Sequence, residues 1–232
     1  MARQGTDRLF PKATIIGAAD RRPLSPDASD DAVTLRLLGL LSARLCHELS
    51  GPIAAIDNGV ELLAEEDSDF IGDAMALVGD SARRARNRLQ FYRFAYGFSD
   101  AAVGAGPAPQ ELARGFFELS RIASDCSESV WSLSPLWQKL ACNLLAVGAD
   151  LLPRGGRVTL TYSPLTLEAM GEAASLSEVA SAALLLRAPV SRLTARAVHA
   201  YFTGLVAKSL GCRLEATAEP GRVRITAGTA ET

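Results

Sequence analysis

The residues best suited to chemistry in this sequence are a histidine and the acid that follows it. His47 is one of two histidines among 232 residues, and Glu48 comes directly after it. A neutral imidazole is a good nucleophile near pH 7, because histidine titrates near pH 6.5, and one ring nitrogen can accept a phosphoryl group. An adjacent carboxylate can orient the ring or take its proton. His47 is therefore a candidate nucleophile; the alternative is a solvated surface histidine without a role.

The apolar pattern around His47 predicts how a helix presents it. Apolar residues recur at spacings of three and four, which is typical of an amphipathic helix. On a helical wheel His47 lies nearly opposite this stripe, so we expect its ring to face water or a partner. Arg44 and Gly51 lie on the same face, and Gly51 would let a partner approach the backbone closely. The stripe consists of Leu38, Leu41, Leu45, Leu49, Ile53, Ile56, Val60 and Leu63.

A proline inside this helical pattern strengthens the case for a function. Pro52 stands five positions after His47, and a proline within a helix costs about 3 kcal/mol. The sequence His47-Glu48-Leu49 with Pro52 resembles the phosphoacceptor box of sensor histidine kinases. Residues 32–228 as a whole resemble the ChpT-type histidine phosphotransferases of alphaproteobacteria. The resemblance implies that His47 is the phosphoacceptor, that Glu48 orients its imidazole, and that receivers dock around Arg44, Gly51 and Pro52.

A second helical pattern follows after a short connection. Residues 1–31 are expected to form a flexible tail, residues 32–98 a helical hairpin and residues 99–109 a linker. A short connection makes the two helices antiparallel neighbours. One hairpin buries little apolar surface, so we expect two copies to form a four-helix bundle in a homodimer. The second helix carries five arginines, and Arg88 is expected to help dock an acidic receiver domain.

Residues 110–232 predict a second domain of mixed α/β type. We expect helices over 110–122, 134–152, 176–186 and 195–210, with strands near 129–133, 158–162, 166–170, 212–217 and 222–226. The fold class is therefore α+β. In the order of its elements this domain resembles the ATP-binding (Bergerat) domain of histidine kinases, in a degenerate form. His199 lies among apolar residues of the last helix and is expected to be structural.

The departures from the kinase pattern predict that this domain does not bind ATP. Asn143 matches the first asparagine of the kinase N-box, but Val147 occupies the position of the second, which holds magnesium in kinases. Asn143 is therefore expected to make only a local hydrogen bond. Glycine-rich loops that could present backbone amides to phosphates are also missing between Leu165 and Leu210. Gly51 stands where bifunctional kinases often carry a threonine or asparagine, so no active phosphatase is expected.

Composition excludes several other classes of protein. The net charge of −2 is not that of a nucleic-acid-binding protein. The apolar runs are too short to span a bilayer, and the first 31 residues contain no signal-peptide core. The four cysteines have no metal-ligand spacing, which predicts reduced thiols in a cytoplasmic protein without a metal site.

The favoured hypothesis is a histidine phosphotransferase that relays a phosphoryl group between the aspartates of receiver domains through His47. By resemblance, the donor is a hybrid kinase and the acceptors are CtrA-like and CpdR-like cell-cycle regulators. The receiver would bring Mg²⁺, and this chain would need no cofactor of its own and no ATP. Two alternatives stay open: a dimer that only binds and sequesters a response regulator, and an active histidine kinase with unusual nucleotide boxes.

Overall fold

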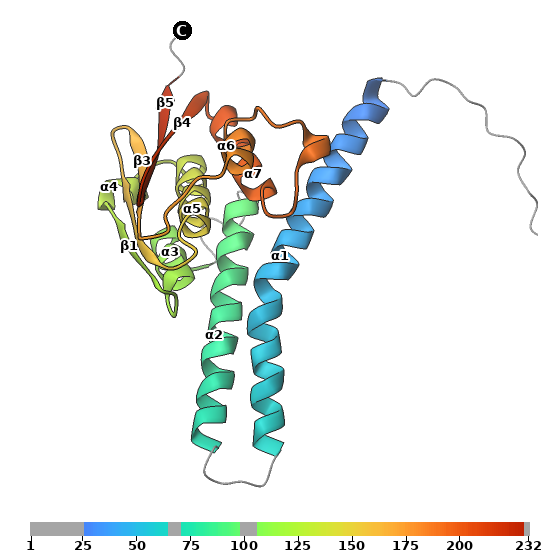
Figure 1. Ribbon diagram of the computed structural model, residues 1–232, viewed down its shortest axis with the longest axis vertical. Coiled ribbons are helices and arrows are strands. Elements are labelled where there is room, and N and C mark those ends of the chain that lie inside the picture. The colour runs from blue at the N-terminus through green and yellow to red at the C-terminus, as the bar shows by residue number, and fades with distance from the viewer. Residues whose placement is uncertain (1–25, 65–70, 98–105, 230–232) are drawn as a thin grey trace, which may run out of the picture.

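Two long antiparallel helices dominate the computed structural model, which describes residues 26–64, 71–97 and 106–229. Helix α1 (Pro26–Ala64) and helix α2 (Ile71–Tyr96) form a hairpin whose far end projects beyond the rest of the molecule (Figure 1). The flexible tail predicted up to residue 31 is wrong for residues 26–31, which are helical. The helix starts at a proline, where the missing N–H is not needed. The rest of the tail, the connection between the helices and most of the linker lie outside the described residues.

The two helices approach each other closely near the far end of the hairpin. Gly59 of α1 is buried, and a Cβ atom added there would lie 2.6 Å from the Val78 Cγ2 atom of α2. Ala74 and Ser81 of α2 are buried as well. Small side chains therefore set the helix spacing, and only part of the apolar stripe of α1 is covered by α2.

Residues 106–229 form an α/β layer structure beside the hairpin. The mixed sheet has the strand order β1-β2-β3-β5-β4, in which β1 and β2 are parallel and the other neighbours are antiparallel. The α+β fold class predicted from the sequence is thus confirmed. The helices are α3 (Pro109–Phe117), α4 (Glu128–Trp131), α5 (Pro135–Asp150), α6 (Glu178–Leu184) and α7 (Val198–Ser209), with a 3₁₀ turn η3 (Val190–Arg192). The strands are β1 (Ile122–Cys126), β2 (Gly156–Thr161), β3 (Leu165–Met170), β4 (Cys212–Glu219) and β5 (Arg222–Thr229).

Two elements at the start of this domain differ from the sequence-based predictions. The helix expected over 110–122 ends at Phe117, because Leu119 adopts a positive φ of 59° and Ile122 begins β1. The strand expected over 129–133 is instead the short helix α4, whose Val130 is buried. Strand β1 is held by parallel pairing with β2, a tertiary contact that the local sequence does not reveal.

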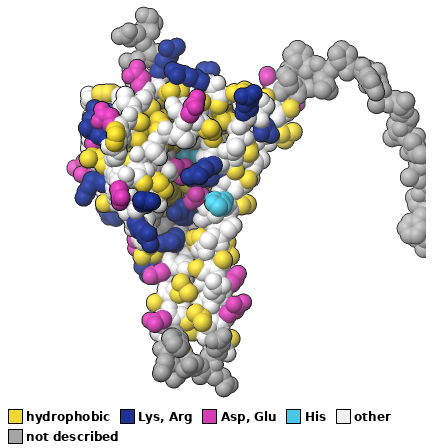
Figure 2. All heavy atoms as spheres, viewed as in Figure 1, with side chains coloured by type: hydrophobic (Ala, Val, Ile, Leu, Met, Phe, Trp, Pro, Cys, Tyr) yellow, Lys and Arg dark blue, Asp and Glu magenta, His cyan; other side chains and the backbone are white. Residues whose placement is uncertain are grey.

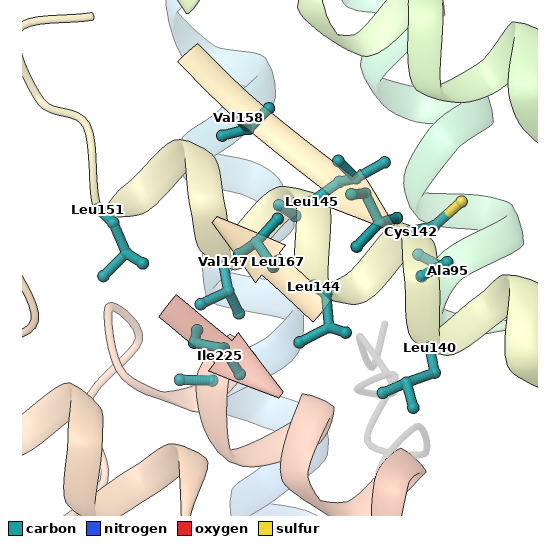
Figure 3. Close-up of a cluster of buried hydrophobic side chains, with 14 of the residues drawn as sticks. Ala95, Leu140, Cys142, Leu144, Leu145, Val147, Leu151, Val158, Leu167 and Ile225 are labelled. Carbon is teal, nitrogen blue, oxygen red and sulfur yellow. The ribbon is translucent and has the colours of Figure 1, made fainter. Parts of the chain in front are cut away.

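Helix α5 lies at the centre of the core. Its Leu144, Leu145 and Val147 pack toward Val158 of β2 and Ile225 of β5 (Figure 3). The end of α2 also enters this core: Phe91 stacks on Phe116 with ring centroids 4.1 Å apart. The second domain and the upper half of the hairpin therefore share one hydrophobic core, which fixes their relative position.

The segment between α6 and α7 is attached to α1. The guanidinium group of Arg36 donates to the backbone oxygens of Val190 (2.9 Å), Ser191 (2.9 Å) and Leu193 (3.1 Å). One arginine of the hairpin thus holds three backbone oxygens of the segment that leads into α7. None of the described helices has the length and hydropathy needed to cross a bilayer.

Candidate functional site

His47 lies on the exposed face of α1, as the helical wheel predicts. It borders a hollow of about 430 Å³ between α1, the end of α5 and the segment before α7. Figure 2 shows an exposed histidine where the hairpin meets the second domain, with basic and acidic side chains around it. The hollow is lined by Arg44, His47, Glu48, Asp150, Ala195 and Arg196.

Arg44 does not lie on the open face that the sequence predicts, and this expectation needs correction. Its side chain is buried. Its Nη2 atom lies 2.7 Å from the Asp150 Oδ1 atom and 3.2 Å from the Glu48 Oε1 atom. Burial acts to lower the pKa of the Arg44 guanidinium, but attraction and hydrogen bonding to Asp150 outweigh burial and raise it. Arg44 therefore joins the two domains beside His47, and a docking role for it stays a prediction.

Glu48 belongs to the same charge network. Its Oε1 atom contacts Arg44, and its Oε2 atom accepts a hydrogen bond from Arg88 of α2. Among the described residues its carboxylate makes no hydrogen bond to His47. The orienting role predicted for Glu48 thus remains a prediction, whereas the contacts show a carboxylate that links α1 to α2.

The other three residues predicted for docking differ in how accessible they are to a partner. Gly51 is exposed, and a Cβ atom added there would have no heavy atom within 4 Å, so its backbone is open to a partner. Pro52 is half-buried, and α1 continues through it to Ala64. Arg88 is partly buried, paired with Glu48 and placed over the Phe116 ring at 5.3 Å. Gly51 is hence the most accessible of these positions, and Arg88 is already engaged within the chain.

Two charged residues at the site were missed by sequence reasoning. Asp150 is the last residue of α5, and Arg196 lies two residues before α7 begins. Both are about 100 or more residues from His47 in sequence, and neither belongs to a motif. Only the packing of the second domain against α1 brings them to the hollow, so no local signal could have identified them.

The second histidine, His199, is fully buried in the second domain. Its Nδ1 atom lies 2.9 Å from the Tyr96 hydroxyl and its Nε2 atom 3.1 Å from the Asn143 backbone oxygen. Burial lowers the pKa of His199 to about 4, although the charge of Asp150 acts in the opposite direction. The ring is therefore neutral near pH 7, with Nε2–H donating to Asn143 and Nδ1 accepting from Tyr96. His199 is structural, as the sequence predicts.

Asn143 makes the local hydrogen bond expected of it and one further contact. Its Nδ2 atom donates to the backbone oxygen of Lys139 (2.8 Å) and to that of Ala95 at the end of α2 (2.9 Å). Val147, one turn later, lines a separate cavity of about 260 Å³ between α5, α6 and α7. Among the described residues no three His, Cys, Asp or Glu side chains are grouped so as to hold a metal ion.

These features define a class of protein: a helical hairpin that presents an exposed histidine beside an α+β domain with a charged hollow at their junction. The model of the histidine phosphotransferase C-terminal domain matches residues 108–222. The protein phosphotransferase ChpT of Brucella abortus is 34% identical over 205 residues, which are 80% of this chain and 92% of that protein. The chain therefore belongs to the histidine phosphotransferase family.

A solved structure agrees with this assignment. A bacterial phosphotransferase determined at 1.7 Å superposes with a TM-score of 0.68 at 31% sequence identity, over 84% of this chain and 96% of that one. The likeness therefore extends over the hairpin and the second domain together. Phosphoryl transfer is the activity that the family assigns to the protein.

Proposed function

We propose that the protein relays a phosphoryl group between the aspartates of response-regulator receiver domains through a phosphohistidine at His47. The observation that carries this proposal is the exposed His47 at the mouth of a charged hollow, on a helix whose neighbouring Gly51 leaves room for a partner. By resemblance the donor is a hybrid kinase and the acceptors are CtrA-like and CpdR-like regulators. The proposal places the protein in the cytoplasm, where such receivers act.

The transfer step is a substitution at phosphorus. A lone pair on one ring nitrogen of neutral His47 forms the N–P bond, while the P–O bond to the receiver's aspartate breaks and leaves a carboxylate. The proton on the other ring nitrogen stays on the imidazole. The second half of the relay reverses the step, with the carboxylate of another receiver as the nucleophile. The receiver's own Mg²⁺ and lysine would neutralise the transferred group, so this chain mainly supplies position.

Three features support a relay that does not use ATP. Val147 occupies the position where kinases place a magnesium-binding asparagine, and it lines a cavity of about 260 Å³, below the roughly 300–1,000 Å³ usual for ligand pockets. Asp150 in the same cavity is paired with Arg44. The segment between α6 and α7 lacks the glycine-rich loops of kinases and is held on α1 by Arg36.

The relay can be tested with a purified receiver that carries ³²P on its aspartate. We expect acid-labile label to move onto the wild-type chain, to move on to a second receiver, and to be absent from His47→Gln. Cys46→Ser is the matched control, since Cys46 is the exposed neighbour of His47 on the same helix. Incubation with labelled ATP alone should leave the chain unlabelled. A His47→Gln variant that still controls its response regulator would favour the sequestering alternative, and labelling by ATP would favour a kinase.

We further propose that the protein acts as a homodimer. Part of the predicted apolar stripe on α1 stays uncovered by α2: Leu38, Ile53 and Val60 are between 50% and 56% exposed. Met75, Leu77 and Leu89 of α2 are exposed too. Side chains of this kind on neighbouring helices are typical of the face that completes a four-helix bundle with a second copy.

Light scattering after size exclusion tests the dimer. Val60→Glu together with Ile53→Glu should convert a dimer of about twice 24.5 kDa into a monomer, because two like charges would meet across an apolar seam. Asn58→Glu is the control, since Asn58 is exposed and lies on the opposite side of the helix. A dimer that survives the double substitution would place the interface elsewhere.

A further inference from the structure

Arg196 lies at the hollow beside His47 and has no assigned role. It is exposed, comes from the segment before α7, and lines both this hollow and the cavity behind it. We propose that Arg196 is a catalytic residue that binds the phosphoryl oxygens while the group moves to or from His47. This inference rests on the proposed relay at His47 and names a group of the second domain that takes part in it.

The charges around the hollow single out this residue. Arg44 is buried and committed to Asp150 and Glu48. Among the carboxylates whose side chains the structure describes, none forms an ion pair with Arg196. A phosphoryl group that enters the hollow therefore meets two carboxylates, an arginine that they already occupy, and one arginine that can still bind an anion.

A guanidinium group suits this task. It stays charged at all physiological pH values and presents donors in a planar fork that matches two phosphoryl oxygens. Negative charge that would otherwise face Glu48 and Asp150 is then offset at the hollow itself. Such stabilisation is strongest where the donor is positioned before the reaction, since no reorganisation is needed.

The backbone that carries Arg196 is well held. The backbone N–H of Ala197 donates to the Thr194 side-chain oxygen (3.3 Å) and to the Thr194 backbone oxygen (3.0 Å). Leu193 is buried, and its backbone oxygen accepts from Arg36. The backbone of Arg196 is thus fixed between a buried anchor and the first turn of α7, next to the buried Ala197 and Val198. Its side chain therefore extends from a held backbone at the edge of the hollow that it lines.

Rapid-quench measurement of transfer from a phosphorylated receiver, over a range of receiver concentrations, tests this role. Arg196→Ala should lower the transfer rate constant at saturating receiver by about 10-fold or more, in line with the loss of one donor to a developing anion. The half-saturating receiver concentration should change by less than about 2-fold, because docking uses other surfaces. Arg196→Lys should recover part of the rate, since it keeps the charge but loses the fork.

Arg192→Ala is the matched control, because Arg192 is exposed in the same segment but does not line the hollow. It removes the same charge from the same region and should leave the rate constant unchanged. Equal behaviour of the two alanine variants would overturn the proposal, as would an Arg196→Ala defect confined to the half-saturating concentration, which would make Arg196 a docking residue. Failure of the relay itself would appear separately, as a wild-type chain that takes no label.

Discussion

The two histidines of this chain both lie on helices, but their surroundings differ in every respect that matters for chemistry. His47 is exposed on α1 at the edge of an open hollow. His199 is fully buried on α7, with both ring nitrogens in hydrogen-bonding distance of chain atoms. A histidine that must meet a partner protein needs exposure, whereas a buried histidine with both nitrogens occupied has none of its reactive atoms available.

One ion pair stands close to both histidines. Arg44 and Asp150 line the hollow at His47, and both act electrostatically on His199. The Arg44–Asp150 pair therefore lies between the hollow at His47, where transfer is proposed, and the buried surroundings of His199, which serve stability. Substitutions on the two sides should separate phosphoryl transfer from folding.

The largest effect on folding is expected at the buried histidine. His199→Ala removes a fully buried ring and leaves the Tyr96 hydroxyl and the Asn143 backbone oxygen without their partner, which should lower the free energy of unfolding by about 3–4 kcal/mol. Urea denaturation measures this loss. Tyr96→Phe removes one hydrogen bond and should cost about 1 kcal/mol. At urea concentrations where His199→Ala is still folded, this variant should accept a phosphoryl group at His47. A folded variant that has lost transfer would contradict the view that His199 serves stability alone.

The pH dependence of stability should carry the signature of His199. The folded protein keeps this ring neutral down to about pH 4, whereas the unfolded chain binds a proton below about pH 6.5. The contribution of His199 to the free energy of unfolding is therefore complete above pH 6.5, and about 3 kcal/mol of it is lost as the pH drops from 6.5 to 4.

Denaturation curves at several pH values test this dependence by subtraction. The difference between wild type and His199→Ala should shrink as the pH falls, because the variant has no ring to protonate. A difference that stays constant between pH 7 and pH 4.5 would show that His199 is not kept neutral by the fold.

The sequence alone predicted the features that depend on local pattern. The apolar stripe of α1 located His47 on the exposed face, and the apolar neighbours of His199 indicated burial. The α+β class and the long helix α5 also followed from periodicity and from Pro135 at a helix start. These features could be predicted because the residues that determine them lie within one or two turns of each other.

What the sequence could not reveal depends on contacts between distant segments. Arg44 appeared exposed on the helical wheel, but Asp150, 106 residues later, buries it. Strand β1 was not predicted, and the helix expected over 110–122 runs into its first residue, Ile122, because β1 is held by pairing with β2, more than 30 residues away. Arg196 carries no motif, and only the packing of the segment before α7 against α1 brings it to the site.

The ion pair at the boundary should have an intermediate effect. Asp150→Ala leaves the buried guanidinium of Arg44 with Glu48 as its remaining carboxylate partner, and it should lower the free energy of unfolding by about 2 kcal/mol. Arg44→Met combined with Asp150→Leu should restore much of the loss, because it removes the unpaired charge along with its partner. A double variant no more stable than Asp150→Ala would show that the pair itself, and not the stranded charge, determines the cost.

The smallest effect on stability is expected from Arg36. Its three hydrogen bonds to the segment before α7 are largely exposed to solvent, so Arg36→Ala should cost about 1 kcal/mol or less. Arg86→Ala is the control, since Arg86 is an exposed arginine of the other hairpin helix. The sharper readout is amide exchange in residues 194–199, which should accelerate in Arg36→Ala alone. This segment carries Arg196 to the hollow at His47 and continues into the helix turn that holds His199. Unchanged exchange there would mean that the core, and not Arg36, holds the segment that connects the two histidines.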